Sequence, residues 1–366
     1  MMTSISLTNA LVGLGWNEER TRQFLAHRAQ GYIPGRVTSS SGVTLAMTHD
    51  GPVEVILQRR FKREAASAAD LPAVGDWLAL EQLAGSPHQA ALRHVLPRRG
   101  AFLRQREADG QPQVLAANVD VAFLVSGLDH DLNPRRIERY LVLANDADVT
   151  PVVVLNKVDI ALDLSRAVSE VHAIAAGTRV VVSSAIDGTG LGELRDQLGA
   201  GHTACLLGSS GVGKSTIVNA LLGEERQAVQ ALREDDSRGR HTTTNRELFV
   251  LPGGGLLIDT PGLRAVGVLG EMGSVGSTFG EIESFARGCR FNDCRHQTEP
   301  GCAVRTAMES GTLSSERYAS HQKLEAERRS VELRADDRAR READRRLGRY
   351  YKQAKKSVRR SRQLDD

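Results

Sequence analysis

A glycine-rich octapeptide constrains the fold of this 366-residue chain more than any other feature. Gly208-Ser-Ser-Gly-Val-Gly-Lys-Ser215 fits the pattern G-x-x-x-x-G-K-[ST] and lies between an apolar run at 203–207 and a helical pattern at 216–222. After a strand and before a helix, such a loop surrounds a polyphosphate with backbone N–H groups and the positive end of the helix. The segment therefore predicts an α/β domain with a phosphate-binding loop.

The residue types in this loop assign roles to individual side chains. Lys214 is expected to reach the β and γ phosphates, and the hydroxyl of Ser215 is expected to bind Mg²⁺ between those phosphates, so both are predicted to act in catalysis. The predicted nucleotide contacts of the loop are Gly208, Ser209, Ser210, Gly211, Val212, Gly213, Lys214, Ser215 and Thr216.

The pattern of apolar and amphipathic segments around this loop agrees with that prediction. Apolar runs recur at 119–125, 149–155, 180–183, 203–207 and 255–258, and helix-length amphipathic segments separate several of them. This alternation is typical of a mostly parallel sheet covered by helices on both faces.

A second motif predicts which base is bound. Asn156-Lys-Val-Asp159 follows the run at 149–155, at the end of the strand where open α/β sheets bind ligands. Guanine offers N1–H and N2–H₂ donors, and one carboxylate can accept both, so Asp159 favours GTP over ATP. The predicted base contacts are Asn156, Lys157, Val158 and Asp159, together with the weaker tripeptide Ser183, Ser184 and Ala185.

A third motif, Asp259-Thr-Pro-Gly262, follows the run at 255–258. It looks like the D-x-x-G element of GTPases, so Asp259 is expected to help hold Mg²⁺ and the Gly262 N–H to sense the γ phosphate. Loss of that phosphate would free the loop. The polar segment 237–244 is the expected first switch, where one of the threonines at 242–244 completes the magnesium shell. Thr243 is also a predicted nucleotide contact.

The residue that positions the attacking water is less clearly indicated. Many GTPases carry a Gln directly after D-x-x-G, but here the residue is Leu263, which cannot orient water. The hypothesis is that His241 or a group supplied by a partner does so.

Cysteine spacing predicts a metal site beyond these motifs. Cys289, Cys294, His296 and Cys302 form C-x₄-C-x-H-x₅-C, which suits a closed, tetrahedral Cys₃His zinc site. Unrelated free thiols are the alternative. Cys205, inside an apolar run, is expected to be a buried core residue.

The first hundred residues predict a separate β domain. Short strand patterns at 42–47, 52–57, 76–83 and 92–96 are separated by Gly, Pro and Ser, which is typical of a small closed barrel such as the OB-fold. Basic clusters at 59–63 and 104–106 would suit an oligonucleotide surface.

Charge and composition limit the remaining classes. The net charge is +3, but residues 321–366 hold 16 Lys or Arg against 9 Asp or Glu, an excess that favours a polyanionic partner or a solvated helix. The sequence holds neither an apolar run long enough for a membrane span nor a signal-peptide pattern, so we expect a cytoplasmic protein.

The motifs also stand in an unusual order, because the base-selecting motifs precede the phosphate loop and D-x-x-G. The domain is therefore predicted to be circularly permuted. With Asn156–Asp159, Gly208–Thr216, Gly239–Thr244, Asp259–Gly262 and the cysteine cluster in this order, the chain resembles the RsgA (YjeQ) family of small-ribosomal-subunit-dependent bacterial GTPases.

The resemblance implies a function as well as a fold. It implies late maturation of the 30S subunit, contact with 16S rRNA, a low GTPase rate raised by the subunit, conversion of GTP to GDP, and one bound zinc; we expect a monomer. The expected parts are an N-terminal extension at 1–34, an OB-fold at 35–108, a permuted GTPase domain at 109–272, a zinc-binding helical domain at 273–350 and a basic tail at 351–366.

Two other functions remain open from the residues themselves. One is a signalling or protein-targeting GTPase with only a protein partner. The other is a zinc-stabilised RNA-binding module that senses nucleotide without useful turnover, which Leu263 keeps open.

Overall fold

The computed structural model describes residues 10–65, 67–106, 111–129, 131–223, 246–259, 268–269 and 275–333. The chain divides into two units, 1–270 and 271–366. The predicted switch residues His241, Thr243 and Gly262, together with Leu263, lie outside the described residues, and so does the tail from 334 onward.

The N-terminal part of the first unit is a closed five-stranded barrel. The strands pair in the cyclic order β1-β2-β3-β5-β4-β1, with β3 and β5 parallel and the other pairs antiparallel. This closure leaves no free sheet edge and confirms the predicted OB-type barrel. Its elements are α2 (Glu18–Arg28), β1 (Ile33–Ser41), β2 (Val43–Thr48), β3 (Gly51–Ile56), α3 (Arg59–Glu64), β4 (Trp77–Leu83) and β5 (Ser86–Val95).

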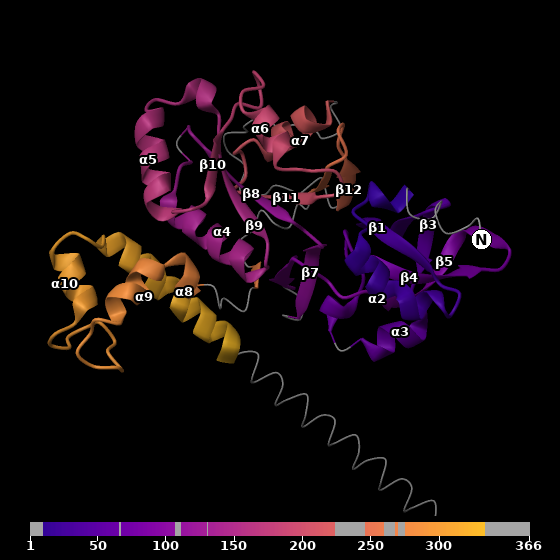
Figure 1. Ribbon diagram of the computed structural model, residues 1–366, viewed down its shortest axis with the longest axis horizontal. Helices are drawn as coiled ribbons and strands as arrows, with labels where there is room; N and C mark the ends of the chain where they lie inside the picture. The colour runs from indigo at the N-terminus through magenta and orange to yellow at the C-terminus, as the bar shows by residue number, and fades with distance from the viewer. Residues whose placement is uncertain are drawn as a thin grey trace, which may run out of the picture. The chain divides into compact units, whose positions relative to one another are not determined.

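The second part of this unit is the predicted α/β domain (Figure 1). Its strands follow the order β10-β9-β8-β11-β13-β12, and all neighbours are parallel except β13 and β12. Its elements are β8 (Val121–Gly127), α4 (Pro134–Asp146), β9 (Thr150–Asn156), α5 (Leu164–Ile174), β10 (Arg179–Val182), α6 (Leu191–Asp196), β11 (Thr203–Leu207), α7 (Lys214–Leu222), β12 (Glu247–Val250) and β13 (Leu256–Asp259).

Alternation along the strands explains why helices cover both faces of this sheet. In β8, Ala122 and Leu124 join the core on the side of α4 and α5, whereas Phe123 joins the core on the side of α6 and α7. Successive strand residues point to opposite faces, so an apolar strand must be covered twice.

Two sheet features were not predicted. A hairpin of β6 (Ala101–Gln105) and β7 (Pro112–Ala117) pairs with β14 (Val268–Leu269), and β1 of the barrel pairs with β12 at Ser39 and Glu247. The barrel and the α/β sheet therefore form one hydrogen-bonded sheet.

A buried arginine joins the barrel to the strand that leads into the phosphate loop. Arg36 on β1 is 2% exposed, and its Nη2 donates to Thr203 Oγ1 at 2.8 Å and to the Asn118 carbonyl at 3.2 Å. Burial lowers the pKa of Arg36 to about 10, so the guanidinium stays protonated at neutral pH. The start of β11 is thus held against the barrel by a charge-assisted bond.

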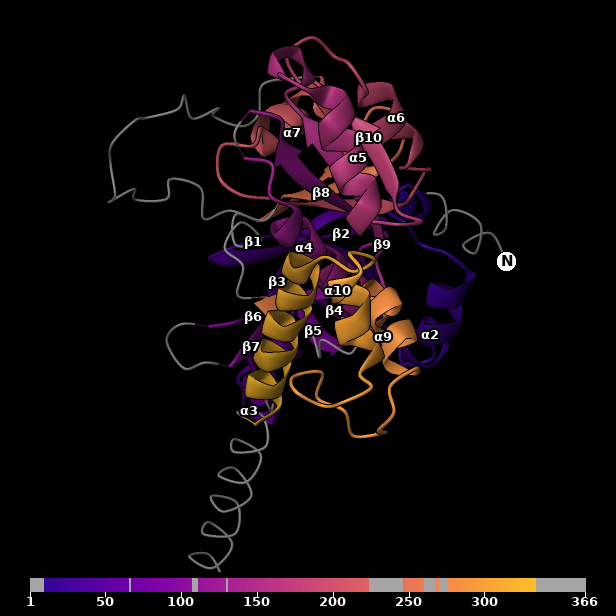
Figure 2. The ribbon, with the colours of Figure 1, turned by 90° about the vertical axis from the view of Figure 1, so that its left-hand side faces the viewer.

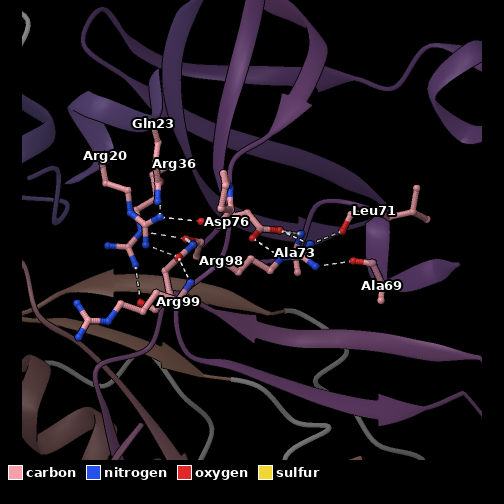
Figure 3. Close-up of polar contacts among 12 residues, drawn as sticks. Arg20, Gln23, Arg36, Ala69, Leu71, Ala73, Asp76, Arg98 and Arg99 are labelled. Carbon is pink, nitrogen blue, oxygen red and sulfur yellow. Dashed lines mark hydrogen bonds and ion pairs between the residues drawn. The ribbon is translucent and has the colours of Figure 1, made fainter. Parts of the chain in front are cut away.

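A second arginine fixes the neighbouring barrel loop (Figure 3). Arg98 makes a bidentate pair with the fully buried Asp76, with both N···O distances 2.7 Å, and also donates to the carbonyl of Leu71 at 2.9 Å. Because Asp76 is fully buried, removing Arg98 would leave the carboxylate without its salt-bridge partner at a large cost.

The second unit is helical in its described part. It contains α8 (Val275–Thr278), α9 (Gly280–Ala286), α10 (Ala303–Glu309) and a helix at 315–333, which confirms the predicted change from strands to helices. Figure 2 shows this last helix beside α9 and α10. The Phe279 and His321 rings meet edge to face, 5.4 Å apart, and Leu324 is buried.

No helix in the described ranges is both long and apolar enough to cross a membrane.

Candidate nucleotide site and metal cluster

The phosphate loop turns between β11 and α7 as the sequence predicts. Gly213, at φ +95°, is the N-cap of α7, and a Cβ atom there would lie 2.3 Å from Asn156 Nδ2. A Cβ atom on Gly208 would lie 2.5 Å from the Val125 carbonyl oxygen. Glycine is therefore required at both positions, by close approach and at Gly213 also by backbone conformation.

Lys214 lies inside this loop. Its ammonium group donates to the Gly208 carbonyl at 2.8 Å and also to the Ser209 carbonyl, and the residue is 8% exposed. Ser215 and Thr216 follow on α7 and are half-buried. The lysine thus lies at the N-terminus of α7, where a polyphosphate would bind.

Asn156, the first residue of the predicted base motif, connects that motif to two others that are distant along the chain. Its Nδ2 donates to the Val212 carbonyl in the phosphate loop at 2.9 Å. Its Oδ1 accepts from Ser183 Oγ at 3.2 Å and from the Ala185 N–H at 3.3 Å. This amide, 2% exposed, fixes the base-selecting loops against the phosphate loop.

Removing the Asn156 amide should weaken nucleotide binding. Asn156→Ala loses three hydrogen bonds in a buried position, and we expect about 10- to 100-fold weaker binding of both GTP and GDP. Titration calorimetry checks this, with Gln197→Ala at the half-buried C-cap of α6 as the control. Unchanged affinity in Asn156→Ala would contradict the assigned role.

The other residues of the predicted base loops differ in conformation and exposure. Lys157 adopts the left-handed conformation at φ 69°, and Asp159 is exposed in the short 3₁₀ turn η2 (Val158–Ile160). Ser183 and Ser184 are fully buried, and Ala185 is half-buried. Asp259 ends β13, parallel to β11, on the same edge of the sheet as the phosphate loop.

Sequence reasoning missed a group of side chains in the segment after β8. Lys157 Nζ lies 2.5 Å from Asp129 Oδ2. Partial burial alone would favour the neutral acid, but the hydrogen bond and charge of Lys157 lower the pKa of Asp129 below its ordinary value. Ser209 in the phosphate loop bonds to Asp131 and Arg136. The signal was available, because these residues follow the carboxyl end of a parallel strand.

The cysteine cluster of the second unit assembles as predicted. The ligand atoms of Cys289, Cys294, His296 and Cys302 all lie within 4.8 Å of one another. His296 Nδ1 is 3.5 Å from Cys289 Sγ and 3.4 Å from Cys302 Sγ, and the two sulfurs are 3.9 Å apart.

These distances fit a tetrahedral metal. Zinc bonds of about 2.3 Å to sulfur and about 2.0 Å to nitrogen require S···S and S···N separations of roughly 3.8 and 3.5 Å. The four donors could therefore hold one zinc ion with no open position. Cys205, by contrast, is fully buried in β11, where burial raises the pKa of its thiol, as expected of a core residue.

Comparisons with known proteins agree with this architecture. A family model described as RsgA GTPase matches residues 95–269. The Small ribosomal subunit biogenesis GTPase RsgA of Opitutus terrae is 45% identical over 336 residues, which cover 89% of this chain and 92% of that protein. The protein of the same name from Streptomyces coelicolor is 42% identical over 345 residues, covering 93% and 92%.

Two solved structures match as well. The crystal structure of YjeQ from Thermotoga maritima is 26% identical with a TM-score of 0.58, covering 81% of this chain and 98% of that one. YloQ, a circularly permuted GTPase, matches in fold at 23% identity and a TM-score of 0.55, covering 82% and 96%. With a permuted motif order, this fold and such identities over about nine-tenths of its length, the chain belongs to the RsgA GTPase family.

Proposed function

We propose that this protein hydrolyses GTP to GDP and phosphate and acts as a late maturation factor of the 30S ribosomal subunit. The single observation that carries the proposal is the set of hydrogen bonds made by the Asn156 side chain. These bonds link the phosphate loop to the predicted guanine-selecting loops at one edge of the sheet. The names of the relatives, which refer to biogenesis of the small ribosomal subunit, supply the biological context.

In this proposal Asp159 selects guanine and Lys214 holds the β and γ phosphates. Ser215, Asp259 and one of the threonines at 242–244 would hold a magnesium ion, which neutralises phosphate charge when it is bound. Thr243 is a further nucleotide contact. Gly262 responds to the γ phosphate, and His241 or a group of the subunit orients the attacking water.

The remaining parts also receive roles. The barrel at 35–108 and the basic end of the chain contact 16S rRNA, and the domain at 273–350 binds one zinc ion through its Cys₃His cluster. The GTPase domain spans 109–272, with an extension at 1–34 and a basic tail at 351–366. The protein acts as a monomer in the cytoplasm.

The test is the GTPase rate with and without 30S subunits. We expect the subunit to raise multiple-turnover phosphate release at least about tenfold, because groups supplied by a partner accelerate GTPases by up to about 10⁵-fold. Lys214→Ala is the blank.

Equal stimulation by a ribosome-free extract would point instead to a protein partner. Phosphate release that stops after one turnover would point to an RNA-binding module that only senses nucleotide. An unstimulated rate with intact GTP binding would contradict the assignment to the 30S subunit.

A further inference from the structure

Three side chains at the back of the phosphate loop form a closed hydrogen-bonded triangle. Ser209 Oγ donates to Asp131 Oδ2 at 2.7 Å and accepts from Arg136 Nη1 at 2.6 Å. The same Arg136 Nη1 lies 2.6 Å from Asp131 Oδ1, which closes the triangle. Each contact involves a charged group, and such bonds are about twice as strong as neutral ones.

The segment that carries this triangle also holds the base loop. Asp129, two residues before Asp131, pairs with Lys157 of the guanine-selecting motif. The segment 129–136 at the end of β8 therefore bonds to the phosphate loop through Asp131 and Arg136 and to the base loop through Asp129. We call it the β8–α4 brace.

We propose that the β8–α4 brace sets the spacing between the phosphate and base loops, with Asp131 and Arg136 as positioning residues for guanine-nucleotide binding. This inference rests on the proposed nucleotide site. Asp131 and Arg136 are assigned no contact with a phosphate or with the base, so they would act on the nucleotide through Ser209 of the phosphate loop.

The hydrogen bonds of Lys214 indicate that the brace contributes most when a nucleotide is bound. Lys214 now donates to the carbonyls of Gly208 and Ser209. When a nucleotide binds, the ammonium group turns to the phosphates and these carbonyls lose that donor. The bonds from Ser209 to Asp131 and Arg136 remain after this change, so the brace keeps the phosphate loop in the conformation that binds the nucleotide.

The chain contains a well-matched control arginine. Arg136 is the third residue of α4 and its backbone N–H bonds to the N-cap Asn133. Arg166 is the third residue of α5 and its N–H bonds to the N-cap Asp163. The Arg166 side chain is 77% exposed and pairs with Glu170 on its own helix.

The experiment compares Arg136→Met with Arg166→Met in the full chain, using GTP and GDP affinity, KM and kcat. We expect Arg136→Met to raise Kd and KM about fivefold with kcat within about twofold, the effect being limited because Arg136 and Asp131 are partly exposed. Arg166→Met should match the unmodified protein.

Three further variants separate positioning from folding. Ser209→Ala should raise Kd and KM as much as Arg136→Met does. The double variant with both changes should bind nucleotide no more weakly than either single variant. Ser209→Thr keeps the hydroxyl and should bind with the affinity of the unmodified protein. Asp131→Asn supplies the same comparison should Arg136→Met not fold.

The outcomes distinguish this inference from the proposed function. Absence of GTP binding by the unmodified protein would remove the proposed site itself. If the unmodified protein binds GTP, three results would overturn the brace alone. These are additive losses of affinity in the double variant, a fall in kcat at constant KM in Arg136→Met, or no difference between Arg136→Met and Arg166→Met.

Discussion

Cys289→Ala is expected to abolish stoichiometric zinc binding and to unfold the described part of the second unit. Losing a hydrogen-bond partner of a ligand already costs about 10- to 100-fold in metal affinity, so losing one of four ligands should cost more. Apart from the helix at 315–333, the described helices of this unit are short, and structural zinc sites contribute about 10–16 kcal/mol to folding in zinc-finger peptides.

Metal analysis of the full chain and hydrogen exchange over residues 275–333 measure this effect. Cys205→Ala, in the core of β11, is the matched control and should keep one zinc per chain. Nucleotide affinity of Cys289→Ala should stay close to that of the unmodified protein. One zinc per chain in Cys289→Ala, or none in the unmodified protein, would reject the Cys₃His assignment.

Asp159→Asn is expected to reverse the base preference from guanine towards xanthine. In the proposed site the Asp159 carboxylate would accept from both N1–H and N2–H₂ of guanine, whereas an asparagine amide would place its own donor against N2–H₂. Each bond to a charged group contributes about 1.5–3 kcal/mol, so losing two of them should lower GTP affinity by at least about 100-fold. Xanthine carries a carbonyl at that position and would accept from the amide.

Competition binding with GTP, XTP and ATP measures the change. Asp187→Asn is the control, since this exposed aspartate follows Ser183–Ala185 and is assigned no contact with the base. Equal losses for GTP and XTP would show that Asp159 supports the loop without reading the base, and an unchanged GTP affinity would remove it from the site.

Local patterns specified the chemistry of this protein. The phosphate loop, Asn156–Asp159 and the cysteine cluster are short, and each function depends on residue types at fixed spacings, so the structure placed their described members as expected. The apolar runs likewise predicted β8 to β11 and β13 to within about two residues, because a strand buried on both faces must be apolar throughout.

Strands that lack such a pattern were predicted less well. The sequence suggested a strand at 92–96, but β5 begins at Ser86 with half-buried or exposed residues and gains its bonds from β4. Strand β1 was not singled out, and it exists because β2 and β4 pair with it along its length. These strands form because neighbouring strands pair with them. Local propensity does not predict which strands will pair.

The sequence by itself thus determined the motifs, their permuted order, the alternation of the sheet and the metal-ligand set. Only the tertiary structure decided which distant residues meet: Arg36 reaches Thr203 across 167 positions, and Arg136 reaches Ser209 across 73. Such contacts depend on how the whole sheet closes, whereas a ligand set within fourteen residues depends on local spacing alone. That difference explains why the sequence predicted the nucleotide and metal motifs but not the contacts among Asp131, Arg136 and Ser209.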